Sequence, residues 1–129
     1  MFNRDSLIQL RPSIPSIKEN GYITPVEHFQ NTTLRPILKQ QNEIILSIYS
    51  SFIDKNRHIY NLLTFEQKEH FIRQSLQKDI ILKNILLGSV LSIFTIKEYN
   101  EFITQEKELK KRINEMLIQR LQDQMGKFE

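Results

Sequence analysis

The stretch LRPILKQQNEIILSIYSSF, from Leu34 to Phe52, carries an apolar pattern that favours an α-helix. When each residue advances by about 100° around a helix axis, most of its apolar side chains fall on one arc. These side chains are Leu34, Ile37, Leu38, Ile44, Ile45, Ile48, Tyr49 and Phe52. Pro36 fits such a helix if Thr32 or Thr33 caps its first turn, because a first-turn residue needs no amide hydrogen. The stretch therefore predicts a long helix with a kink or restart near Pro36.

Helix starts elsewhere in the chain can be read from capping-box patterns. A Thr hydroxyl can accept the amide hydrogen of the third helical residue, and a Glu or Gln at that residue can bond back to the Thr amide. Such patterns occur at Thr24-Pro25-Val26-Glu27, Thr64-Phe65-Glu66-Gln67 and Thr95-Ile96-Lys97-Glu98. An interhelical connection is expected at residues 54–61 and a break near Thr104, and no alternating strand pattern is found. We expect an all-α fold, a single bundle of four to five helices over residues 24–129.

The N-terminal segment, residues 1–23, has a different character. It contains Pro12, Pro15 and Gly21 and shows no sustained apolar period. We therefore expect an extended N-terminal arm that lies along the bundle. With 129 residues in all, the chain has the length of one domain.

The composition limits the class of protein. Hydrophobic residues make up 40% of the chain and charged residues 26%, which is typical of folded globular domains and not of disordered ones. With no Cys, the sequence predicts no disulfide and no thiolate metal site, and we expect no cofactor and no metal. Arg4 and Asp5 interrupt the apolar core that a signal peptide needs, and the apolar run 85–96 is too short to span a bilayer. We expect a cytoplasmic protein without a membrane anchor.

The charge pattern disfavours a nucleic-acid partner. The net charge is only +3, and the densest basic cluster, Lys107, Lys110, Lys111 and Arg112, is interleaved with glutamates. On a helix, opposite charges three and four residues apart largely offset one another. A solvated face is therefore the main interpretation, and a strip that contacts phosphates is the alternative.

Two polar groups interrupt apolar helix faces and are candidate site residues. Gln41 falls near the centre of the apolar arc, where a buried amide needs hydrogen-bond partners. In the later stretch SLQKDIILKNILLGSVLSIF, which we expect to be a central helix apolar nearly all round, Asp79 and Lys83 lie one turn apart. The candidate cluster consists of Arg35, Lys39, Gln41, Asn42, Asp79, Lys83 and Asn84. It is either a structural polar network between helices or a small-molecule pocket in which Arg35 can bind a carboxylate or phosphate.

Three stretches carry a resemblance to a known family. They are FQNTTLRPILKQQN, LQKDIILKNILLGSVLSIFT and KKRINEMLIQRL. Together they resemble a family of short, uncharacterised helical proteins encoded in Bacteroidetes-type genomes, over most of the chain from about Glu27 onward. Some members of that family are labelled glyoxalase, so the resemblance implies a shared helical fold and, for those members, a lyase activity.

The residues themselves favour a protein that is not an enzyme. A metal glyoxalase uses His, Glu or Gln ligands on the strands of paired βαβββ modules, whereas this chain lacks a strand series and its three His are isolated. Glu66 and His70 lie one turn apart, which is more typical of a helix surface than of a metal site. No HExxH motif, Cys nucleophile or Gly-rich phosphate loop is present.

These observations support three functional hypotheses. The leading one is a helical interaction protein that self-associates or binds a protein partner, because the C-terminal helix has an apolar stripe with charged flanks. That stripe consists of Leu109, Ile113, Met116, Leu117 and Leu121, although a monomer can also bury it internally. The second is a small-molecule-binding or lyase-type protein that uses the polar cluster, and the third is a nucleic-acid-binding regulator.

Overall fold

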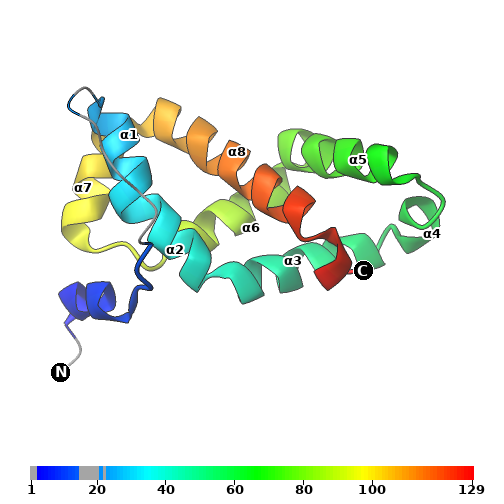
Figure 1. Ribbon diagram of the computed structural model, residues 1–129, viewed down its shortest axis with the longest axis horizontal. Coiled ribbons are helices and arrows are strands. Elements are labelled where there is room, and N and C mark those ends of the chain that lie inside the picture. The colour runs from blue at the N-terminus through cyan, green and yellow to red at the C-terminus, as the bar shows by residue number, and fades with distance from the viewer. Residues whose placement is uncertain (1–2, 15–20, 22) are drawn as a thin grey trace.

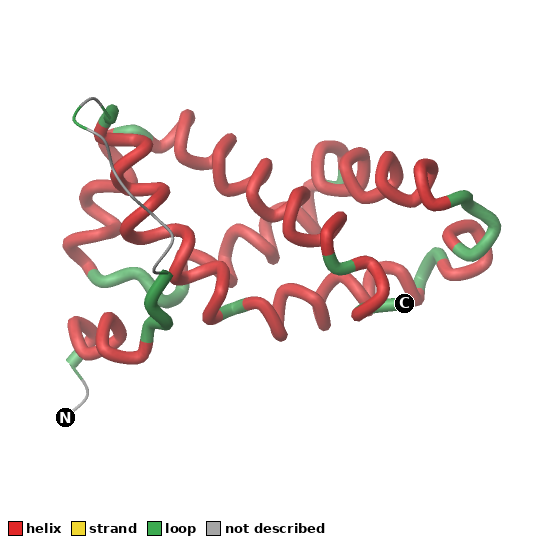
Figure 2. Tube along the Cα trace, viewed as in Figure 1, coloured by secondary structure: helices red, strands yellow, loops and turns green. Residues whose placement is uncertain are grey.

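The computed structural model describes residues 3–14, 21 and 23–129, and all regular structure in these residues is helical (Figures 1 and 2). The expected all-α fold is confirmed. The elements are η1 (Arg4–Leu10), α1 (Pro25–Phe29), η2 (Gln30–Leu34), α2 (Arg35–Gln40), α3 (Asn42–Asp54), α4 (Arg57–Tyr60), α5 (Phe65–Lys78), α6 (Ile80–Leu91), α7 (Ile96–Thr104), α8 (Glu106–Asp123) and η3 (Met125–Lys127). In this part of the chain η1 and η3 are 3₁₀-helices and η2 is a π-helix.

The expected count of four to five helices is wrong, because the described residues form eight α-helices. Single residues with non-helical backbone angles divide segments that the sequence suggests are continuous. Gln41, with φ −89° and ψ 6°, separates α2 from α3, and Asp79, with φ −85° and ψ 100°, separates α5 from α6. A further one-turn helix, α4, lies within the connection expected at residues 54–61. The break expected near Thr104 is present, since α7 ends there.

Of the kink or restart expected near Pro36, the restart capped by Thr32 or Thr33 does not occur. Phe29, Leu34 and Arg35 all have α-helical angles, so the backbone stays helical through this region. Pro36 has no amide hydrogen, and its ring would clash with the carbonyl four residues back in a regular α-helix. A π turn precedes it instead, in which the Arg35 amide donates to the carbonyl of Gln30, five residues back.

Threonine side chains cap the N-termini of three of the helices. Thr64 and Thr95 form complete capping boxes with Gln67 and Glu98, as the sequence predicts. At Thr24 the hydroxyl accepts the Glu27 amide at 3.1 Å, ahead of a first-turn proline. These caps place the starts of α1, α5 and α7 where the sequence puts them.

The core lies between the longer helices. α6 packs against α3, α5 and α8, and α8 runs diagonally across the molecule between the end that holds α7 and the end of α3 (Figure 1). Leu109, Ile113, Leu117 and Leu121 of α8 are at most 1% exposed, so the monomer buries most of the stripe that suggested self-association. Burial of such side chains is the main favourable contribution to folding.

The N-terminal segment differs from the expected extended arm over residues 4–10, which form the 3₁₀-helix η1. Its place is set by two arginines that bind the chain between α6 and α7. Arg4 donates from Nε to the backbone carbonyl of Phe94 at 2.6 Å. Its Nη2 donates to the backbone carbonyl of Ser92 at 2.5 Å. Arg11 donates to the carbonyl of Ile93 at 2.9 Å. Residues 15–20 and 22, which also belong to the expected arm, lie outside the described residues.

No helix in the described part of the chain is long and apolar enough to cross a membrane.

Candidate functional site

The seven residues of the predicted polar cluster do not share one cavity. Arg35 and Lys39 line a hollow between α2 and α8, whereas Lys83 and Asn84 line a groove between α6 and α8. Asn42 lies beside the first hollow, where it bonds to two residues of its lining. The remaining two, Gln41 and Asp79, serve the packing of the helices.

Gln41 and Asp79 each satisfy a structural need. The Gln41 side-chain amide donates to the carbonyl of Ser89 in α6 at 2.8 Å, which joins the break before α3 to the neighbouring helix. Asp79 is the N-cap of α6, and its carboxylate accepts the amide hydrogen of Leu82 at 3.0 Å. The pairing of Asp79 with Lys83 that the helical spacing suggested is not among the ion pairs of the described residues.

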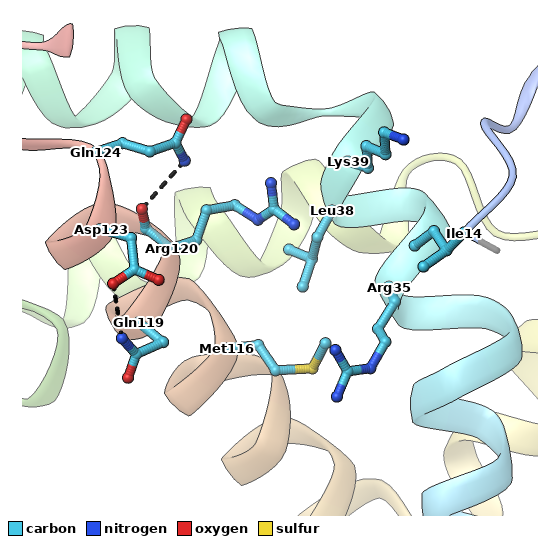
Figure 3. Close-up of a pocket in the computed structure, with 9 residues that line it drawn as sticks. All are labelled: Ile14, Arg35, Leu38, Lys39, Met116, Gln119, Arg120, Asp123 and Gln124. Carbon is cyan, nitrogen blue, oxygen red and sulfur yellow. Dashed lines mark hydrogen bonds between the residues drawn. The ribbon is translucent and has the colours of Figure 1, made fainter. Parts of the chain in front are cut away.

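The hollow between α2 and α8 has a volume of about 630 Å³ and is strongly cationic. Arg35 extends into it from α2 and Arg120 from α8, from opposite sides (Figure 3). Lys39 lies at its edge and donates to the carbonyl of Ser13 at 3.4 Å. The one carboxylate in the described lining is that of Asp123, which accepts a hydrogen bond from Gln119 at 2.9 Å. Leu38, Met116 and Ile14 supply apolar surface to the same hollow.

A network of neutral amides holds Arg120 in place. Asn42 and Gln124 bond reciprocally, with donor to acceptor distances of 2.9 and 2.8 Å. Arg120 donates to the side-chain amide oxygen of Asn42 at 3.2 Å, and the Gln124 side chain donates to the backbone carbonyl of Arg120 at 3.1 Å. Hydrogen bonds to neutral amides restrict the rotamer of a charged side chain without neutralising its charge.

The two arginines act on each other electrostatically. Burial lowers the pKa of Arg120, the nearby charge of Arg35 lowers it further, and the Asp123 carboxylate partly opposes both effects. Arg35 itself donates to the side-chain oxygen of Asn31 at 3.2 Å, a neutral acceptor. Within the described residues, neither arginine has a carboxylate partner in an ion pair.

The second hollow is a groove of about 490 Å³ between α6 and α8. Lys83 of α6 and three lysines of α8, Lys107, Lys110 and Lys111, line it together with side-chain amides and an apolar floor. Lys110 pairs with Glu106 at 3.0 Å, so part of this positive charge is offset as the sequence predicts.

The outer face of α6 is the clearest departure from the sequence expectation of a central, enclosed helix. Its exposed residues are Ile80, Ile81, Asn84, Ile85 and Gly88. Three of them are isoleucines, with exposed fractions of 71%, 74% and 50% in chain order, and none of the five is charged. The buried side of the same helix consists of Leu82, Leu86 and Val90. We call these five exposed residues the α6 face.

Two further properties of the described residues bear on function. No group of three or more His, Asp or Glu side chains there is placed to hold a metal ion. Sequence reasoning also missed Arg120 and Gln124, which lie about eighty positions from Asn42 and carry no motif that would join them to it.

No protein-family model matches the chain, and none of the curated proteins or solved structures matches it. The resemblance to the Bacteroidetes-type family therefore stays a prediction.

Proposed function

We propose that this chain is a non-enzymatic helical interaction protein that self-associates through the α6 face. The observation that supports it is a set of three exposed isoleucines on one helix whose exposed residues include no charge. Contiguous exposed apolar surface of this kind is typical of interaction sites.

Charge favours a second copy as the occupant of this face. Each chain carries a net charge of +3, so two copies repel each other, and their contact surface should add no further like charges to that repulsion. A symmetric dimer sets the same patch of both subunits against each other. The α6 face meets that condition, because its members are apolar or neutral and bring no like charges together at its centre.

Gly88 is consistent with a helix packed on this face. It costs about 1 kcal/mol relative to Ala in a helix interior. An added Cβ at Gly88 would meet nothing within 4 Å, so the packing of one copy does not require a glycine here. A small residue at the crossing point lets a second helix approach closely.

The expected affinity is modest. Burial of the exposed parts of the isoleucines contributes on the order of 1–2 kcal/mol each, and a symmetric dimer buries those of both copies. Association costs on the order of 4–15 kcal/mol in lost translational and rotational freedom. These contributions nearly offset each other, so a weak dimer is expected, with a dissociation constant no lower than about 1 μM.

Ile85→Glu tests this proposal, with Ile103→Glu as a matched control. Ile85 and Ile103 are 50% and 46% exposed, and the second belongs to α7 and not to the α6 face. Sedimentation velocity across a concentration series should find a dimer for the wild type and for Ile103→Glu, and a monomer for Ile85→Glu. A monomeric wild type, or equal dissociation of both variants, would contradict the proposal.

A second candidate is binding of nucleic-acid phosphates along the groove between α6 and α8. It is favoured by the four lysines that line this groove. Affinity for a DNA duplex should then fall steeply with salt, because each neutralised phosphate releases counterions. Lys107→Gln combined with Lys111→Gln should reduce the slope, and an unchanged slope would remove this candidate.

A further inference from the structure

We infer that the hollow between α2 and α8 binds a small organic phosphate, in which the phosphate lies between Arg35 and Arg120. This goes beyond self-association and does not depend on it, because the α6 face and the lining of this hollow share no residue.

The first argument is charge. The described lining contains three cationic residues and one carboxylate, so it carries a net charge of +2. The cations are Arg35, Lys39 and Arg120, and the carboxylate is that of Asp123. A phosphate monoester is a dianion near neutral pH and matches this excess. Arginine is also the cation best shaped for it, since its planar guanidinium can donate two parallel hydrogen bonds to phosphate oxygens.

The second argument is the arrangement of the two guanidinium groups. They reach into the hollow from α2 and α8 and repel each other, and their hydrogen bonds in the described chain go to neutral amides. Two like charges that face each other without an ion-pair partner among the described residues are unfavourable in the empty protein. An anion between them would replace that repulsion with two attractions, so the geometry favours the bound state.

The third argument is preorganisation. The reciprocal bond between Asn42 and Gln124 fixes the amide oxygen to which Arg120 donates. The arginine therefore loses less conformational freedom on binding than a solvent-exposed side chain would. Nothing comparable restrains the lysines Lys107 and Lys111 of the α6–α8 groove, for which the described residues provide no ion pair.

The lining also indicates what the phosphate is attached to. Leu38, Met116 and Ile14 give the hollow an apolar part, and its volume of about 630 Å³ exceeds what a phosphate group alone requires. A phosphate that carries a small apolar or aromatic group should therefore bind more tightly than inorganic phosphate.

Calorimetric titration of the full chain with phenyl phosphate, inorganic phosphate and benzoate tests the inference. At low ionic strength we expect phenyl phosphate to bind more tightly than the other two. If benzoate binds as tightly as phenyl phosphate, the site is a carboxylate site and the phosphate assignment is overturned. No binding of phenyl phosphate by the wild type overturns the whole inference.

Three variants locate the binding. Arg35→Gln and Arg120→Gln should each weaken phenyl phosphate at least about tenfold, the effect of losing a hydrogen bond to a charged group. Lys97→Gln removes the same charge from an exposed residue of α7 and should leave the affinity unchanged. Equal weakening by Lys97→Gln, or unchanged binding in both arginine variants, overturns the inference.

Arg35→Gln keeps the test valid if Arg120→Gln fails to fold. Arg35 is exposed, and its hydrogen bond to Asn31 lies within its own helical run, so its loss should leave the thermal midpoint nearly unchanged. Phenyl phosphate should raise the midpoint of the wild type and not that of Arg35→Gln. An equal rise in both proteins contradicts the assignment.

Discussion

Tyr49 and Ser75 form a buried polar contact in the core, and its two partners should respond differently to mutation. Their hydroxyl oxygens lie 2.8 Å apart, and Ser75 also donates to the carbonyl of Ile72 at 2.8 Å. The serine proton is thereby used, so the tyrosine is the donor of the shared bond. Burial raises the pKa of Tyr49 far above its usual value, and the Ser75 hydrogen bond lowers it by a smaller amount. The raised pKa keeps the phenol neutral.

Tyr49→Phe should therefore cost less than Ser75→Ala. The first change removes one hydrogen bond, worth about 1 kcal/mol, and leaves Ser75 bonded to Ile72. The second leaves the tyrosine hydroxyl buried without its partner, at a cost of about 2 kcal/mol. Urea unfolding measures both, and the double variant should resemble Tyr49→Phe. A smaller loss for Ser75→Ala than for Tyr49→Phe would reverse the assignment of donor and acceptor.

Glu98 and Arg11 form a nearly buried ion pair that ties the N-terminal segment to α7. Their side chains are 11% and 7% exposed, and one of their two contacts measures 2.6 Å. Burial alone would raise the pKa of Glu98. Hydrogen bonds from Arg11 and from the Thr95 amide outweigh it, so the pKa of Glu98 lies below its ordinary value of 4.5.

The pKa of Glu98 is lower in the folded than in the unfolded protein. The ionised carboxylate therefore contributes to the free energy of unfolding above pH 4.5, and this contribution is lost as the pH falls through the folded pKa. Glu98→Gln should cost about 3 kcal/mol at neutral pH, since it leaves Arg11 buried without an opposite charge. Glutamine can still close the capping box, as Gln67 does in α5, so the variant isolates the charge. Chemical unfolding between pH 7 and 3 should find this difference shrinking with acid.

Glu101→Gln is the matched control for this pH dependence. Glu101 is an exposed residue of the same helix and appears in no ion pair of the described chain. Its stability curve should follow the wild type throughout. A difference between Glu98→Gln and the wild type that does not change with pH would mean that packing, and not charge, explains the loss.

At the scale of elements, Gly88 links the stability of α6 to its proposed role. Gly88→Ala should stabilise the monomer by about 1 kcal/mol, because alanine is the better helix former and its Cβ meets nothing. The same methyl group should weaken self-association if a second α6 crosses there. Gly126→Ala is the control, since its Cβ is equally unopposed and Gly126 lies in η3. Sedimentation measures the association and thermal unfolding measures the stability. If Gly88→Ala associates like the wild type, a second α6 does not cross at Gly88.

The sequence predicts the helices well where a side chain caps them, and less well where a helix is interrupted inside. Thr64 and Thr95 begin helices as their local pattern indicates. Gln41 carries no such signal, and the break there shifts the phase of α3 relative to α2. Ile44, expected on the same buried arc as Leu34 and Leu38, is therefore 48% exposed.

At the scale of the whole molecule, the candidate site was only half predictable. Arg35 and Lys39 are one turn apart, so the helical period alone places them together. Arg120 joins them from a helix about eighty residues later, and its position depends on how α8 crosses the molecule (Figure 1). A helical period gives the face of each helix but not which faces meet, and the turns at Gln41 and Asp79 decide that.

Added salt should separate the two proposed properties of the molecule. Dimerisation through the α6 face brings together apolar and neutral residues, so screening removes none of its attraction and reduces the repulsion between chains of charge +3. Phosphate binding between Arg35 and Arg120 relies on charge, and added chloride competes for it. Raising NaCl from about 0.05 M to about 0.5 M should leave the dimer as stable or stabilise it, and should weaken phenyl phosphate binding several-fold. Sedimentation and calorimetry on the same preparation measure both, and a dimer that dissociates with salt would place the contact on the charged faces of the chain instead.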